Sequence, residues 1–201
     1  HRQSNPENYN WTLKEALRTR TFWYLVFAMA IGVMANGGIG FHQFAYFRDQ
    51  GISQAMAAIA LSSYALSGAI ANGLWGWLVE KISERLIAVV TMGAASLLCL
   101  FLMRVDSFPE AMIFAILFGL AARGESSIIM MMQANYYGRK SFGAISGFST
   151  PFQQIGLGLG PTLAAIPYDI LGTYNYGFVA FALLYVLSGL LILLAKRPNP
   201  P

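Results

Sequence analysis

Two ionisable residues, Arg123 and Glu125, lie near the middle of a long apolar stretch of the chain. An ionised side chain at the centre of a bilayer costs on the order of 3 kcal/mol on insertion scales, so each residue is expected to face a partner or a water-filled cavity. Residues two positions apart point in different directions on a helix, so the two are not assumed to form an ion pair.

Arg123 is the residue that we expect to bind an anionic substrate. It shares a helix face with Gly119, Ser126 and Ser127, and its planar guanidinium matches the shape of a carboxylate. The alternative is a structural arginine that is satisfied by Glu125 or by the carbonyls of a neighbouring helix. Glu125 lies among apolar residues and is interpreted as part of a helix-packing surface and as a candidate for proton coupling.

The first apolar stretch carries a second polar group. Asn36, Gly40 and Gln43 are separated by four and three residues, so they share a helix face, and Asn36 and Gln43 are expected to bind substrate. The glycines within 37–40 weaken a helix, and interrupted helices recur at the binding sites of transporters. His42 is a candidate proton carrier, and the alternative is a hydrogen-bonded packing residue.

Two weaker candidates lie on other stretches. Tyr64 is expected to contribute to the site from the second stretch, and Gln154 from the fifth. The fifth stretch also repeats glycine at fourfold spacing, for example at Gly156 and Gly160, and we interpret this pattern as close helix packing.

The composition indicates that these residues are positioned by membrane-spanning helices. Hydrophobic residues make up 56% of the chain and charged residues only 11%, which leaves too little polar surface to cover a water-soluble globule. We predict an all-α, polytopic membrane domain over 20–195. A cytoplasmic linker and an interfacial helix over 1–19 precede it, and Thr12 and Glu15 are expected to cap that helix. A cytoplasmic tail over 196–201 follows the domain. The six expected transmembrane helices cover about 20–47, 53–79, 86–103, 110–137, 142–170 and 174–195.

The basic residues predict the orientation of the chain. If the amino terminus is cytoplasmic, ten Lys and Arg residues lie on the inner side, and only Arg48 and Arg104 lie outside. We therefore expect a multi-pass protein of the cell membrane with both termini in the cytoplasm.

Several classes of function are disfavoured by the same residues. The basic residues form no patch interleaved with exposed aromatics, so nucleic acid is not an expected partner. The single Cys99 excludes an internal disulfide, and no metal cluster, cofactor motif or Walker loop is evident. A membrane-embedded enzyme is disfavoured because no nucleophile with a base is recognisable.

The connection between the second and third stretches carries the one motif with a family resemblance. Gly76, Glu80, Lys81 and Arg85 resemble the cytoplasmic gating motif of the major facilitator superfamily, with Ser83 where glycine is usual. Such decay is common in the second copy of the motif, which implies the carboxy-terminal half. The runs 41–53 and 136–174 are similar to the monocarboxylate and oxalate–formate branch.

The resemblance implies a six-helix half-transporter built from two inverted three-helix repeats. Its expected partners are a small organic anion, such as a mono- or dicarboxylate, the lipid bilayer, and the amino-terminal six-helix half of the same transporter. Transport would proceed by alternating access. The alternative is a free-standing six-helix channel, or a half-size transporter that dimerises.

Overall fold

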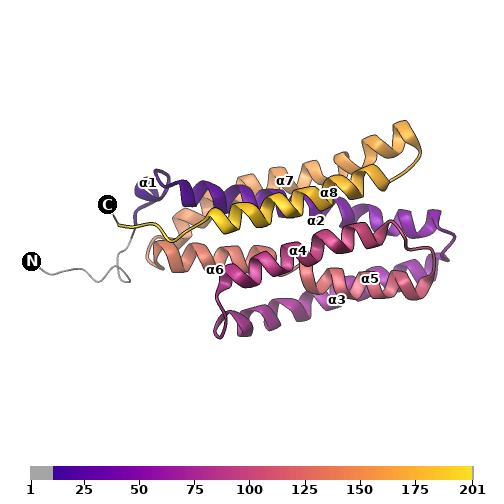
Figure 1. Cartoon of the computed structure of the whole chain (residues 1–201), viewed down its shortest axis with the longest axis horizontal. Helices are drawn as coiled ribbons and strands as arrows, with labels where there is room; N and C mark the ends of the chain where they lie inside the picture. The colour runs from indigo at the N-terminus through magenta and orange to yellow at the C-terminus, as the bar shows by residue number, and fades with distance from the viewer. Residues whose placement is uncertain (1–10, 201) are drawn as a thin grey trace, which may run out of the picture.

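A computed structural model describes residues 11–200 of the chain, and helices make up most of them. The short α1 (Leu13–Ala16) is followed by long helices that lie side by side along the longest axis of the molecule (Figure 1). These helices are α2 (Arg20–Asp49), α3 (Gln54–Val79), α4 (Glu84–Leu102), α5 (Phe108–Ala122), α6 (Glu125–Tyr137), α7 (Phe142–Leu171) and α8 (Asn175–Leu194).

Side-chain caps and glycines set the ends of these helices. The expected capping box at Thr12 and Glu15 is present at α1, which is shorter than the sequence predicted. Ser53 and Ser83 accept hydrogen bonds from the first turns of α3 and α4. Gly172 ends α7 with φ of 67°, a left-handed conformation that favours glycine. The predicted linker over residues 1–10 and the last residue of the tail lie outside the described residues.

Five helical stretches are long and apolar enough to cross a membrane. They are Arg20–Asp49, Gln54–Val79, Glu84–Leu102, Phe108–Tyr137 and Asn175–Leu194. The expected span over 142–170 coincides with α7, which is not among these five, so its assignment stays a prediction. Large apolar side chains such as Leu66, Leu97 and Ile170 are exposed, as expected of a surface that faces lipid.

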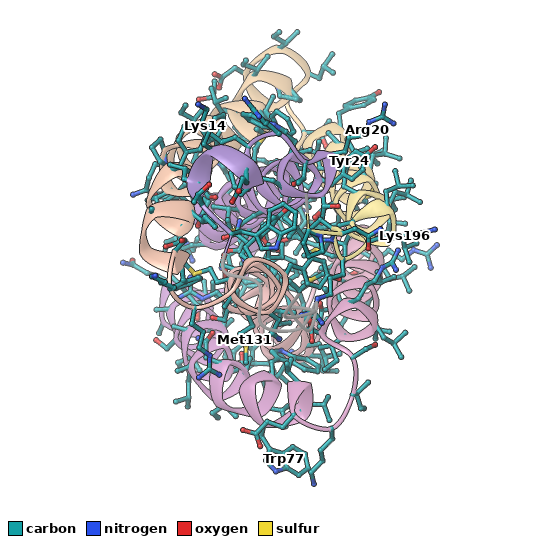
Figure 2. All side chains as sticks on the ribbon, turned by 90° about the vertical axis from the view of Figure 1, so that its left-hand side faces the viewer. Lys14, Arg20, Tyr24, Trp77, Met131 and Lys196 are labelled. Atoms are coloured by element: carbon teal, nitrogen blue, oxygen red, sulfur yellow. The ribbon has the colours of Figure 1, made fainter. Side chains whose placement is uncertain are left out.

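Apart from Arg123, the basic residues of the described chain lie at the two ends of the bundle. α1, the 80–83 and 138–141 connections and the residues after α8 lie at one end, and Figure 2 views the molecule from there with Lys14, Arg20 and Lys196 labelled. Arg48 and Arg104 lie at the opposite end. The cytoplasmic assignment of the basic end stays a prediction.

Close backbone contacts hold α2 against α7. A Cβ on Gly156 or Gly160 would overlap the carbonyl oxygens of Ala30 and Met34, respectively, so only glycine permits this approach. The fourfold glycine spacing is therefore a packing feature at these two positions. Together with the pairs α3–α5 and α4–α8, this interface makes the core of the domain.

Candidate functional site

The centre of the candidate site is a break in a membrane-spanning stretch. The segment predicted as one helix over 110–137 is divided into α5 and α6, with Arg123 and Gly124 between them. The last backbone bond of α5 runs from the Arg123 amide to the Gly119 carbonyl at 3.3 Å, and the Ile128 amide donates to the Gly124 carbonyl at 3.1 Å. The break lies near the middle of the span, where polar backbone requires protein or a cavity around it.

The interruption expected at the glycines of the first stretch is absent, and that prediction was wrong. α2 is one helix from Arg20 to Asp49. Gly37 and Gly38 are instead sites of close packing, because a Cβ on Gly37 would lie 2.9 Å from the Leu157 side chain and one on Gly38 would overlap the ring of Phe181. Tertiary contacts, and not flexibility, explain why these positions are glycine.

Arg123 lies at the break and its side chain is exposed. Its guanidinium carbon is 5.2 Å from the centroid of the Tyr64 ring, a cation–π geometry. The aliphatic part of Arg123 crosses Gly68, where a Cβ would lie 2.6 Å from the arginine Cγ. The contacts with Tyr64 and Gly68 of α3 set the direction of the Arg123 side chain, and the side chain remains exposed.

Hydrogen bonds join Tyr64, Asn36 and the break. The Tyr64 hydroxyl donates to Asn36 Oδ1 at 2.8 Å, and Asn36 Nδ2 donates to the Ala122 carbonyl at 3.1 Å. Residues from α2, α3 and the end of α5 therefore form one connected group. The sequence predicted Asn36, Tyr64 and Arg123 as site residues, and the structure brings these three together.

Two cavities of about 210 and 220 Å³ adjoin this group, and Asn36, Arg123 and Leu157 contribute to both. The first is lined by Val33, Asn36, Asn72, Ala122, Arg123, Glu125, Ser126 and Leu157. The second is lined by Asn36, Gly37, Gly40, Phe41, Tyr64, Arg123 and Leu157. A cationic side chain, an amide and a phenol thus surround space that a small anion can enter.

Glu125 borders the first cavity but has a different environment from Arg123. Its side chain is 2% exposed, and neither carboxyl oxygen has a hydrogen-bond partner. The carboxyl group packs against Gly32, where a Cβ would lie 2.8 Å from the carboxyl carbon. Glu125 therefore does not satisfy Arg123, and the structural alternative based on this pair does not hold in this conformation.

Three other predicted residues lie outside the lining of both cavities. Gln43 is buried and its Nε2 donates to the Gly40 carbonyl at 3.5 Å, whereas Gln154 is exposed on α7. His42 Nε2 lies 2.9 Å from the Pro161 carbonyl oxygen, the contact expected of a packing histidine. The roles of these residues in binding or proton coupling stay predictions.

The residues of the gating motif lie at the basic end of the bundle. Gly76 is near the end of α3, and the Nζ of the exposed Lys81 is 3.8 Å from the centroid of the Trp77 ring. Glu80 is also exposed, and Arg85 Nε donates to the Ile192 carbonyl at 3.2 Å. The Ile192 carbonyl, in the final turn of α8, also accepts from the Ala195 amide at 3.1 Å. The gating role of the motif stays a prediction.

Sequence reasoning missed Trp75. Its Nε1 donates to the Leu120 carbonyl at 2.7 Å, and its ring packs on Gly124. The usable signal was the spacing of Gly68, Asn72 and Trp75, which places them on one face of α3. Within residues 11–200, no group of three or more His, Cys, Asp or Glu side chains is placed to hold a metal ion.

Comparison with known proteins gives concordant results. The sequence profile described as Major Facilitator Superfamily matches residues 23–201. Monocarboxylate transporter 2 of Mesocricetus auratus is 26% identical to this chain over 161 residues, which are 77% of this chain and 33% of that protein. Monocarboxylate transporter 2 of Homo sapiens has the same identity and coverage. The chain thus spans about a third of the length of these curated relatives.

A solved structure has the same fold. The crystal structure of FucP, a Major Facilitator Superfamily transporter in the outward conformation, superposes with a TM-score of 0.78 at 15% identity. The match covers 98% of this chain and 48% of FucP.

Proposed function

Because the chain belongs to the Major Facilitator Superfamily, whose matched members are transporters and not enzymes, we propose that it forms the carboxy-terminal half of a secondary transporter for a small organic anion. The superposition on about half of FucP supports the assignment as a half. The decayed gating motif from Gly76 to Arg85 supports the carboxy-terminal position. The proposal includes a sixth span, α7, and two inverted three-helix repeats.

The observation that carries the substrate class is the position of Arg123. Its charged group is accessible next to two cavities, near the middle of a membrane-spanning stretch. A counter-charge stabilises a cation at membrane depth, and a carboxylate matches the geometry of a guanidinium through two parallel hydrogen bonds. The printed names of the curated relatives, which are monocarboxylate transporters, agree with a carboxylate substrate.

The substrate would lie between this half and an amino-terminal half, which closes the accessible side of Arg123. Rocking of the two halves around the bound anion would then expose it to either side of the membrane in turn. In this arrangement the basic end of the bundle, with Lys14 and Lys196, faces the cytoplasm.

Glu125 is the better of the two candidates for proton coupling. An ionised carboxyl group without a hydrogen-bond partner is strongly disfavoured away from water, so the proton state of Glu125 depends on whether the cavity is open. His42, in contrast, contacts a backbone carbonyl and lines neither cavity.

The experiment that tests this function is uptake of labelled mono- and dicarboxylates by the complete transporter reconstituted in vesicles. Arg123→Ala is expected to abolish uptake at an unchanged level of membrane insertion. Arg104→Ala, at the opposite end of the bundle from α1, is the matched control and should keep wild-type uptake. Unchanged uptake by Arg123→Ala would exclude the proposed role.

A further inference from the structure

The break between α5 and α6 leaves four carbonyls without their helical partners. Within the described chain, the amides of Gly124, Glu125, Ser126 and Ser127 do not donate to the carbonyls four residues earlier. Those carbonyls belong to Leu120, Ala121, Ala122 and Arg123. In a bilayer, an unsatisfied backbone carbonyl is strongly destabilising, because no water replaces the missing donor. The break therefore needs donors from other helices.

Side chains of two helices supply donors to two of these carbonyls. Trp75 Nε1, from α3, donates to the Leu120 carbonyl at 2.7 Å. Asn36 Nδ2, from α2, donates to the Ala122 carbonyl at 3.1 Å. Asn36 also lines both cavities, so it can contact an anion directly, whereas Trp75 lines neither. The two residues thus differ in how they can act on the site.

A strip of three residues on α3, Gly68, Asn72 and Trp75, follows the break from one side to the other. Gly68 receives the aliphatic part of Arg123, and Asn72 Oδ1 accepts a hydrogen bond from the Ser127 hydroxyl at 3.0 Å. Trp75 meets Gly124, where an added Cβ would lie 2.9 Å from the indole Nε1 and would overlap Cδ1. The strip therefore fixes the residues before, within and after the break relative to α3.

The rest of the Trp75 ring packs against the apolar core and is partly buried. It lines an apolar cavity of about 360 Å³ with residues of α4 and α5, among them Leu98 and Leu117. The indole thus lies between this cavity and the break, and only its N–H reaches a polar group of the site. Trp75 has no route to a substrate in either cavity beside Arg123.

We propose that Trp75 is a positioning residue for anion binding, which aims Arg123 by holding the Leu120 carbonyl and the Gly124 backbone against α3. This inference rests on the proposed anion-binding role of Arg123. Arg123 follows the Leu120 carbonyl by three residues and precedes Gly124 directly, so a shift of the break changes the direction of the guanidinium. The expected effect is on affinity for the anion more than on the maximal rate of transport.

The test measures KM and maximal rate of uptake in the complete transporter. Trp75→Phe removes the N–H donor and is expected to raise KM about tenfold, the effect of losing one hydrogen bond to a buried carbonyl, with little change in maximal rate. Trp77→Phe is the matched control: Trp77 lies on the same helix, is exposed, and its ring contacts Lys81 and not the break. It should keep the wild-type KM.

A second variant reaches the same contact from the other side. Gly124→Ala introduces a Cβ that displaces the indole, and it is also expected to raise KM, whereas Gly73→Ala, with no atom within 4 Å of its added Cβ, should not. Both changes disturb the same contact between Trp75 and the break. The double variant should therefore raise KM no more than the larger single change. If Trp75→Phe fails to insert, Gly124→Ala and Gly73→Ala alone decide the question.

Two failures can be told apart. Wild-type KM for both Trp75→Phe and Gly124→Ala, in a transporter that Arg123→Ala inactivates, would overturn the positioning role and leave the proposed function intact. Fully additive effects of the two changes would also overturn it. Normal uptake by Arg123→Ala would instead refute the proposed function itself.

Discussion

Arg123 and Glu125 are separated by one residue, yet the Arg123 side chain is exposed beside two cavities whereas the Glu125 carboxyl group is buried without a hydrogen-bond partner. The two residues lie on either side of Gly124, Arg123 as the C-cap of α5 and Glu125 as the first residue of α6, and their side chains point in different directions. In the proposed function, the exposed Arg123 binds the anion and the buried Glu125 exchanges a proton when the cavity opens.

Neutralising Glu125 separates anion binding from proton coupling. Glu125→Gln keeps the shape of the side chain and removes its ability to ionise, so anion exchange should continue while uptake driven by a pH gradient is lost. The measurement is uptake with and without an imposed gradient. Glu110→Gln, in the first turn of α5 and outside the lining of both cavities, is the control and should retain gradient-driven uptake. Gradient-driven uptake by Glu125→Gln would assign the proton to another group.

His42 is expected to act in packing. His42→Gln should retain pH-gradient-driven uptake, because the ring contacts the Pro161 carbonyl and not the cavities. Loss of the hydrogen bond should lower the free energy of unfolding by about 1 kcal/mol, measured by denaturation in detergent. Loss of gradient dependence in this variant, with Glu125 unchanged, would make His42 the proton carrier.

The interface between α2 and α7 should be sensitive to a single methyl group. Gly160→Ala forces a Cβ onto the Met34 carbonyl, so the helices must separate and the melting temperature should fall. The expected loss is about 1–3 kcal/mol, the range for overpacking a well-packed contact. Gly158→Ala is the matched control, since nothing lies within 4 Å of its added Cβ. Better helix propensity should leave that variant unchanged or more stable by up to about 1 kcal/mol.

The hydroxyl of Tyr137 should stabilise the attachment of α1 to the end of α6. It lies 2.7 Å from the Thr19 hydroxyl, and the Trp11 ring packs edge-on against Tyr137 at 5.5 Å between centroids. Tyr137→Phe keeps the ring contact and should cost about 1 kcal/mol of stability. Proteolysis near residue 19 should become faster in this variant, and an unchanged rate would mean that the hydroxyl pair contributes nothing to the attachment.

The sequence predicted the helical, membrane-spanning character of the chain because its apolar residues fall into long blocks. The ends of α2 and α3 lie close to the predicted 20–47 and 53–79, where Thr19 and Ser53 supply caps. Local composition and capping chemistry are sufficient for such features.

The break and its supports could not be predicted in the same way. Gly124 is a single glycine, and what distinguishes it is contact with Trp75, which is far away in the sequence. Gly37 and Gly38 have low helix propensity and suggested an interruption of the helix. Packing against Leu157 and Phe181 nevertheless accompanies a continuous α2. Tertiary contacts therefore overrode local propensity at both places.

The most direct test of the central claim is equilibrium binding of a labelled monocarboxylate to the purified complete transporter. Arg123→Ala should abolish measurable binding, and Arg123→Lys should weaken it by about tenfold, because lysine keeps the charge and loses the planar fork. Arg104→Ala should bind as the wild type does. Wild-type affinity in Arg123→Ala would contradict the assignment of Arg123 as the anion ligand.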